Sequence, residues 1–282
     1  MGQGEKLFKD PVHGYISVPS DYCRDFIDTP IFQRLRHIEQ TSMRPLYPAA
    51  RHDRFIHSLG VYHLGRRVLD QLTQNTSDPE LLGILRSDRL RQSFLVACLM
   101  HDCGHAPFSH TCEGFYNYSE AGTAQRAYTA LAEAFPGQDF RVQDGFDPAP
   151  HEALSAVVLT RFYADALRPR QCDPELMARM ITGCTYPSPT DVRQRVDNCL
   201  IGLLNGSAVD VDKLDYVLRD TWASGVRNTS VDVDRLICAV CLHAETAGKA
   251  TTCFRQSALS VIQSVVDARN YLYEWVYNHH TV

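Results

Sequence analysis

A cluster of polar residues at the end of an apolar run constrains this chain more than any other feature of its sequence. Residues 94–100 are almost entirely apolar, and His101 and Asp102 follow directly, with two more histidines at His105 and His110. Such a run is typical of a helix that is buried on most sides. Buried charge is costly unless it is paired or bound to a metal. We therefore expect these side chains to meet partners from other helices around a metal ion.

The composition limits the class of protein and its partners. A length of 282 residues allows one large domain or two small ones, and 44% hydrophobic with 22% charged residues is ordinary for a soluble globular protein. The net charge of −5 argues against a general nucleic-acid or membrane-surface binder. No apolar stretch is long enough to span a bilayer, and no basic-then-apolar leader opens the chain. These features predict a cytoplasmic protein without disulfides.

The pattern along the chain predicts a predominantly all-α fold in a single domain, residues 1–282. Small β-hairpins are expected at 6–20 and 245–256. The segment 114–150 is polar, and we interpret it as an insertion or a lid around one helix at 123–134. The other expected helices span residues 21–28, 30–38, 57–72, 79–87, 89–100, 151–167, 174–183, 191–205, 208–220, 232–244 and 257–278.

One cysteine pair has the spacing of a zinc ligand pair. Cys238 and Cys241 are separated by two residues, but the chain has no second pair of this kind, and both lie in an apolar run. We therefore interpret them as part of a buried helix face.

Four ionisable residues fall on apolar helix faces and together suggest a metal site. They are His57, His101, Asp102 and Asp212. Two imidazoles and two carboxylates suit a divalent transition metal such as Fe, Mn, Zn, Ni or Co. A six-coordinate ion would keep positions for water and a phosphate oxygen, and would lower the pKa of that water. Taken singly, each residue has a plainer explanation, such as a core histidine bonded to one neighbour.

The same residues resemble the H…HD…D signature of the HD superfamily of metal-dependent phosphohydrolases. Four ordered blocks extend the resemblance to its deoxynucleoside triphosphate triphosphohydrolase branch: residues 28–36, 54–60, 101–110 and 210–216. The likeness runs from about Lys6 to His279 and implies an HD-domain helical bundle. It also implies that His57, His101, Asp102 and Asp212 hold the metal.

The resemblance assigns roles to further residues near the expected site. His105, His110 and His151 match additional active-site histidines, which suit phosphate contacts and proton transfer. It implies that His110 is the general acid toward the departing 5′-oxygen and that Glu113 orients it. The alternative for each histidine is a structural hydrogen bond.

Seven residues match positions that contact the nucleotide in this branch. Arg54, Lys213 and Arg269 match phosphate contacts, Gln40, Tyr216 and Asp220 match sugar contacts, and Tyr277 would flank the nucleoside. Residues 213, 216 and 220 also share one helix face, for which a solvated face with ordinary ion pairs is the alternative. Thr41 departs from the pattern, because vertebrate members carry a leucine there, so the choice between deoxyribose and ribose stays open.

The expected reaction is hydrolysis of a deoxynucleoside triphosphate to deoxynucleoside and triphosphate, with metal-activated water attacking the α-phosphorus. Additional Mg bound to the triphosphate is expected, as is assembly into a homo-oligomer. The chain ends at Val282, before the C-terminal lobe of longer relatives. Two alternatives are an HD phosphohydrolase or phosphodiesterase acting on a ribonucleoside triphosphate, a monophosphate or a cyclic or signalling nucleotide, and a nucleotide-binding regulatory module.

Overall fold

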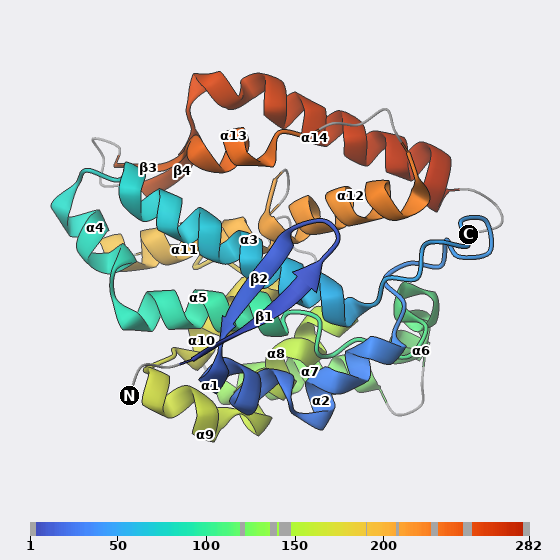
Figure 1. Ribbon diagram of the computed structural model, residues 1–282. Coiled ribbons are helices and arrows are strands. Elements are labelled where there is room, and N and C mark those ends of the chain that lie inside the picture. Colours follow the sequence, from blue (N-terminus) through green and yellow to red (C-terminus); the bar gives the residue numbers. More distant parts are fainter. Residues whose placement is uncertain are drawn as a thin grey trace.

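Helices dominate the computed structural model, which also contains two small hairpins among the described residues (Figure 1). The structure describes residues 4–118, 122–135, 140, 148–189, 191–206, 209–226, 231–244 and 250–278. The predicted, predominantly all-α fold is confirmed. Within the described ranges, no helix combines the length and apolar character needed to cross a membrane.

The elements follow one another in this order. The α-helices are α1 Ser20–Tyr22, α2 Pro30–Gln33, α3 Arg54–Asn75, α4 Pro79–Leu85, α5 Asp88–Met100, α6 Gly114–Tyr118, α7 Thr123–Ala134, α8 Pro150–Phe162, α9 Ala164–Leu167, α10 Pro174–Thr182, α11 Val192–Leu204, α12 Val211–Ser224, α13 Val233–Cys238 and α14 Leu259–Leu272. Short 3-10 or π turns are η1 Cys23–Ile27, η2 Arg34–His37, η3 Ser109–Cys112, η4 Arg168–Arg170, η5 Gln256–Ala258 and η6 Tyr273–Tyr277. The strands are β1 Glu5–Asp10, β2 Gly14–Pro19, β3 Val240–Ala244 and β4 Ala250–Phe254.

Side-chain caps fix where the three central helices begin. Asp53 accepts a hydrogen bond from the Ile56 amide at the start of α3, and Ser87 does the same at α5. Asp210 caps α12 by accepting from the Lys213 amide at 2.6 Å. Such caps satisfy amides that the helix itself leaves unpaired. They also set the first turn of α3 and of α12, where two of the predicted metal ligands lie.

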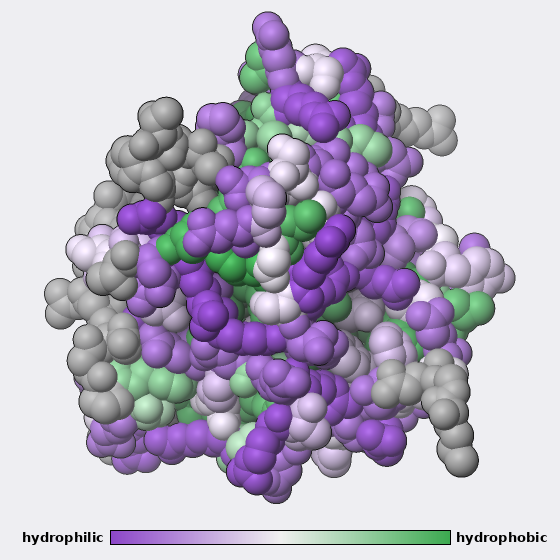
Figure 2. Space-filling model, turned by 90° about the vertical axis from the view of Figure 1, so that its left-hand side faces the viewer, coloured by the Kyte–Doolittle hydropathy of each residue, from purple (hydrophilic) through white to green (hydrophobic). Residues whose placement is uncertain are grey.

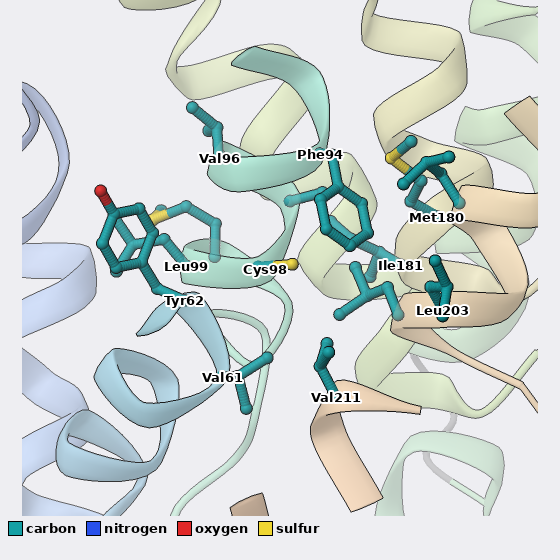
Figure 3. Packing of buried hydrophobic residues seen from close by; sticks show 14 of the residues in the cluster. Val61, Tyr62, Phe94, Val96, Cys98, Leu99, Met180, Ile181, Leu203 and Val211 are labelled. Carbon is teal, nitrogen blue, oxygen red and sulfur yellow. The ribbon is translucent and has the colours of Figure 1, made fainter. Parts of the chain in front are cut away.

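The main hydrophobic core forms around α5. Figure 3 shows side chains of α5 packed against those of α3, α10, α11 and α12. Phe94 and Cys98 are fully buried, as the apolar run predicts. The outer surface seen in Figure 2 is mostly hydrophilic, with hydrophobic residues gathered in small areas. The end of α5 therefore delivers His101 and Asp102 into the interior.

The N-terminal hairpin lies across α3 (Figure 1). Its strands β1 and β2 pair antiparallel with Asp10 opposite Gly14, which confirms the hairpin predicted at 6–20. Ile16 and Val18 of β2 are fully buried. The hairpin is thereby anchored by apolar packing, with its turn directed toward α12.

The helix predicted at 232–244 is wrong in its second half. Helix α13 ends at Cys238, and strand β3 begins at Val240 and pairs with β4. An apolar run this short fits a helix or a strand equally, and only the partner strand decides. Cys238 is exposed and Cys241 lies half-buried on β3, so the predicted buried helix face is also wrong. The hairpin predicted at 245–256 begins earlier in the structure, where its strands run from 240 to 244 and from 250 to 254. Residues 245–249 lie outside the described ranges.

Two other predicted segments differ in detail. The helix predicted at 208–220 runs from Val211 to Ser224 because its cap is Asp210 and Gly225 ends it in the left-handed region, at φ +74°. In the segment 114–150, α7 packs on α8 and buries Ala127 and Leu131 in the main core. Residues 119–121, 136–139 and 141–147 of this segment lie outside the described ranges.

Candidate metal and phosphate site

Three separate elements bring the four predicted metal ligands together. His57 lies in the first turn of α3, His101 and Asp102 directly follow α5, and Asp212 lies in the first turn of α12. His57 Nε2 is 3.3 Å from His101 Nε2 and 3.0 Å from Asp212 Oδ1. Asp102 completes the group, with Oδ2 3.7 Å from His57 Nε2 and Oδ1 3.5 Å from His101 Nε2. These atoms surround one point in the interior.

The hydrogen bonds behind both histidines leave Nε2 facing that point. His101 donates from Nδ1 to the Cys98 carbonyl at 2.9 Å, and His57 donates from Nδ1 to Asp215 Oδ2 at 2.7 Å. Ligand histidines in proteins commonly donate their other nitrogen in this way. Two inward Nε2 atoms with two carboxylates are a donor set that fits a divalent transition metal.

The electrostatics of the cluster are dominated by its carboxylates. Burial alone would lower the pKa of His57, but hydrogen bonds with Asp212 and Asp215 raise it to about 10. Burial would raise the pKa of Asp212, yet the hydrogen bond from His57 lowers it to about 2. The pKa of Asp102 stays well below its usual value, against burial, because of Arg54 and the neighbouring histidines. A metal ion bound at His57 Nε2 would therefore compete with a proton for that nitrogen.

A second cluster of three histidines and one glutamate lies beside the first. Glu113 accepts hydrogen bonds from Nδ1 of His110, at 2.9 Å, and from Nδ1 of His151. The rings of His105 and His151 stack with centroids 4.0 Å apart. His105 Nε2 lies 3.3 Å from Asp102 Oδ1, but neither ring nitrogen of His105 forms a hydrogen bond within the described residues. The structure thus gathers all four predicted side chains next to the metal ligands.

The turn between His105 and His110 is strained. Phe108 and Ser109 both adopt the left-handed region, with φ of 67° and 53°, which L side chains rarely adopt. Such strain persists only where surrounding contacts enforce it. Here Ser109 Oγ accepts from Arg54 Nη2 at 2.5 Å. The contact with Arg54 therefore supports the strained backbone of Ser109, next to His110.

Gly104 allows the turn that follows α5 to pack directly on α8. A methyl group at position 104 should push this turn away from α8. A Cβ on Gly104 would lie 2.4 Å from the Ser155 amide nitrogen and 2.8 Å from the His151 carbonyl. We expect Gly104→Ala to lower the free energy of unfolding by about 1–3 kcal/mol through overpacking. Thermal denaturation measures this.

Gly83→Ala is the matched control for this substitution. A Cβ on Gly83 in α4 would meet no atom within 4 Å, so alanine there should stabilise the helix by about 1 kcal/mol. Equal melting temperatures for Gly104→Ala and the wild type would contradict the close packing.

Arg54 links the two clusters. Its buried guanidinium donates to Asp102 Oδ2 at 2.6 Å, and its Nη2 lies 3.1 Å from His110 Nε2. The Gln40 carbonyl accepts from Arg54 and Ser109, while Gln40 Oε1 and Thr41 Oγ1 are buried with no hydrogen-bond partner among the described residues. Arg54 therefore joins the two clusters and Gln40 lies against it, while the substrate contacts of both stay predictions.

The other predicted substrate residues form a group on α12 and α14. Lys213 Nζ binds Asp210 Oδ2 at 2.6 Å and the Gly206 carbonyl at 2.8 Å, so in this structure it supports the start of α12. Asp220 accepts from the Tyr277 hydroxyl and from His52 Nε2.

Tyr216 and Arg269 belong to the same group. The guanidinium of Arg269 lies 5.5 Å from the ring centre of Tyr273, and its pKa is raised, against burial, by Tyr216. Contacts with one another thus connect Tyr216 with Arg269 and Asp220 with Tyr277, and their role in substrate binding stays a prediction.

Sequence reasoning missed the residues behind the ligands, namely Asp10, His13, His52, Asp215 and Arg219. One pattern in the sequence could have identified Asp215 and Arg219. They follow Asp212 at three and seven positions, on a helix face that is otherwise buried. Nothing in the sequence near the hairpin connects it with α12.

Comparison with known proteins gives a family and several relatives. Residues 54–135 match the family described as HD domain. The chain is 31% identical to Deoxynucleoside triphosphate triphosphohydrolase SAMHD1 of Danio rerio over 281 residues, which cover 97% of this chain and 42% of that protein. It is 29% identical to Deoxynucleoside triphosphate triphosphohydrolase SAMHD1 homolog of Dictyostelium discoideum, covering 98% of this chain and 46% of that protein.

A bacterial relative is similar to the same extent. The Uncharacterized protein MG461 homolog of Mycoplasma pneumoniae is 29% identical, over 96% of this chain and 56% of that protein. The chain thus spans about half the length of the curated relatives it matches. The predicted extent of the resemblance, nearly the whole chain, is confirmed.

Proposed function

Because residues 54–135 of this chain are an HD domain, we propose that the protein is a metal-dependent phosphohydrolase that cleaves deoxynucleoside triphosphates to deoxynucleoside and triphosphate. The observation that carries the proposal is the close approach of His57, His101, Asp102 and Asp212, with three histidines beside them. The names of two relatives given above support the substrate class.

The two clusters suggest a division of work. His57, His101, Asp102 and Asp212 would hold a divalent transition metal, which would supply an activated water and polarise the phosphorus centre. His110 is suited to protonate the departing 5′-oxygen from Nε2 when its ring is doubly protonated, because Glu113 accepts the hydrogen bond from Nδ1 and stabilises the charged ring. His105 and His151 would contact phosphate oxygens.

Arg54 controls whether His110 is available. In the structure its guanidinium contacts His110 Nε2 as well as Asp102. A triphosphate would draw Arg54 toward its own charge and free His110 Nε2. Arg269 and Lys213 are proposed to neutralise the remaining phosphates, and for Lys213 this requires release of the Asp210 contact. Tyr216, Asp220, Gln40 and Tyr277 are proposed to hold the nucleoside.

Product analysis tests the reaction. We expect Mn²⁺- or Fe²⁺-loaded protein to convert dNTPs into deoxynucleoside and intact triphosphate in equal amounts, measured by anion-exchange chromatography. The same protein treated with a chelator is the control and should be inactive. Release of pyrophosphate or monophosphate would contradict cleavage of the bond between the α-phosphorus and the 5′-oxygen, and absence of any dNTP turnover by loaded protein would contradict the proposal.

A ribonucleoside triphosphate is the second candidate substrate. Thr41 Oγ1 and Gln40 Oε1 are buried polar atoms without a partner in the described part of the chain, and a sugar hydroxyl would satisfy such atoms. Polar partners of this kind discriminate strongly between sugars that carry or lack a hydroxyl. NTPs included in the same chromatographic screen separate the two candidates. A cytoplasmic location, a homo-oligomer and the identity of the metal stay predictions.

A further inference from the structure

The carboxylate of Asp215 is held from three directions. Its Oδ2 accepts from His57 Nδ1 at 2.7 Å and from Arg219 Nε at 2.8 Å. Its Oδ1 accepts from Arg219 Nη2 at 2.8 Å and from His13 Nε2 at 2.6 Å. Asp215 and Arg219 are completely buried. Each oxygen thus carries two charge-assisted or close hydrogen bonds, and the carboxylate cannot rotate without breaking several of them.

His13 reaches this carboxylate from the N-terminal hairpin. Asp10 Oδ1 accepts from the amides of Val12 and His13, at 2.8 and 2.7 Å, which folds the turn between β1 and β2. Asp10 Oδ2 accepts from Arg219 Nη1 at 2.9 Å and fixes the turn to α12. The side chain of His13 is only 5% exposed. The hairpin therefore presents His13 to Asp215 in one orientation.

Helix α3 leaves space for the Asp215 carboxylate and the Arg219 guanidinium at Gly60. A Cβ on Gly60 would lie 1.8 Å from Asp215 Oδ1 and 2.5 Å from Arg219 Nη2. Any side chain at position 60 would occupy the space of the carboxylate. The arrangement therefore depends on a residue of α3 that makes no polar contact itself.

We propose that His13 is a positioning residue, which acts through Asp215 to hold the His57 ring with Nε2 directed at the metal site. The proposal rests on the metal site of the proposed function. His13 fixes Asp215 Oδ1, so Oδ2 stays directed at the Nδ1 proton of His57. The N-terminal hairpin thereby sets the affinity of a metal site whose ligands lie on α3, α5 and α12.

Metal affinity tests this more directly than activity does. We expect His13→Phe to weaken Co²⁺ binding by about 10-fold, the scale on which groups behind a ligand act, and to shift the visible d–d spectrum of the Co²⁺ protein. His13→Gln keeps an N–H donor and should restore most of the affinity. Binding is measured by competition with a chromophoric chelator, on variants whose metal-free melting temperature shows that they are folded.

His63→Phe is the matched control. The His63 ring lies 5.3 Å from that of His13, but Asp215 receives no hydrogen bond from it. Its Co²⁺ affinity and spectrum should equal those of the wild type. The inference is overturned if His13→Phe binds Co²⁺ like the wild type, if His13→Gln is as weak as His13→Phe, or if His63→Phe weakens binding equally. Failure of the wild type itself to bind a divalent ion would instead overturn the proposed function, and this inference with it.

Discussion

Asp212→Ala should lower the phosphohydrolase rate by more than about 10³-fold, because it removes the ligand that α12 supplies to the proposed metal site. Asp212 Oδ1 lies 3.0 Å from His57 Nε2 and 3.8 Å from His101 Nε2. Without it, two imidazoles and one carboxylate remain, and His57 loses one of the two carboxylates that position it. The loss should appear in kcat measured at saturating metal and substrate, together with a lower metal content by elemental analysis.

Asp234→Ala is the control for this substitution. Asp234 lies in the first turn of α13, as Asp212 does in α12, but its side chain is 82% exposed. Its removal should leave both rate and metal content unchanged. A fully active Asp212→Ala variant would exclude the proposed site, whatever the product.

Arg219→Met should lower the free energy of unfolding by about 3–5 kcal/mol, because it leaves two buried carboxylates without their cation. Arg219 binds Asp215 through Nε and Nη2 and Asp10 through Nη1, at 2.8 to 2.9 Å, and all three side chains are buried. For a chain of this size the expected decrease in melting temperature is roughly 10 °C. The measurement uses metal-free protein, so that lost metal binding does not contribute.

Arg24→Met provides the contrast. Arg24 forms an equally short pair with Asp25, at 2.6 Å, but its side chain is 73% exposed. Exposed pairs contribute about 0–1 kcal/mol, so the melting temperature should hardly change. Similar effects of the two substitutions would show that burial does not control the strength of the Asp10–Arg219–Asp215 group.

Residues with a local pattern could be found from the sequence. His57 stands on an otherwise apolar helix face, and His101 and Asp102 end an apolar run, so the requirement that buried charge be partnered was sufficient to single them out. The four side chains lie close together, and their role as metal ligands stays a prediction. Their chemistry could be expected because it depends on residue type, whereas their distances depend on how three helices pack.

The residues that were missed depend on contacts far apart in the sequence. His13 stands in a turn whose local pattern predicts only a hairpin, and its partner Asp215 is 202 positions away. Strand β3 was missed for a similar reason, because Val240 and its neighbours become a strand only when 250–254 pairs with them. Local periodicity carries no information about such partners.

The span between the hairpin and α12 also determines when the site is completed during synthesis. Asp10 and Arg219 are 209 positions apart, so roughly 10 to 40 s of translation separates their appearance at ordinary ribosome speeds. In that interval Asp10 Oδ2 and the His13 ring lack their α12 partners, and His57 lacks both Asp212 and Asp215. A nascent chain that stops before α12 cannot fix His57. Metal binding would therefore indicate that the chain has been made and folded through α12.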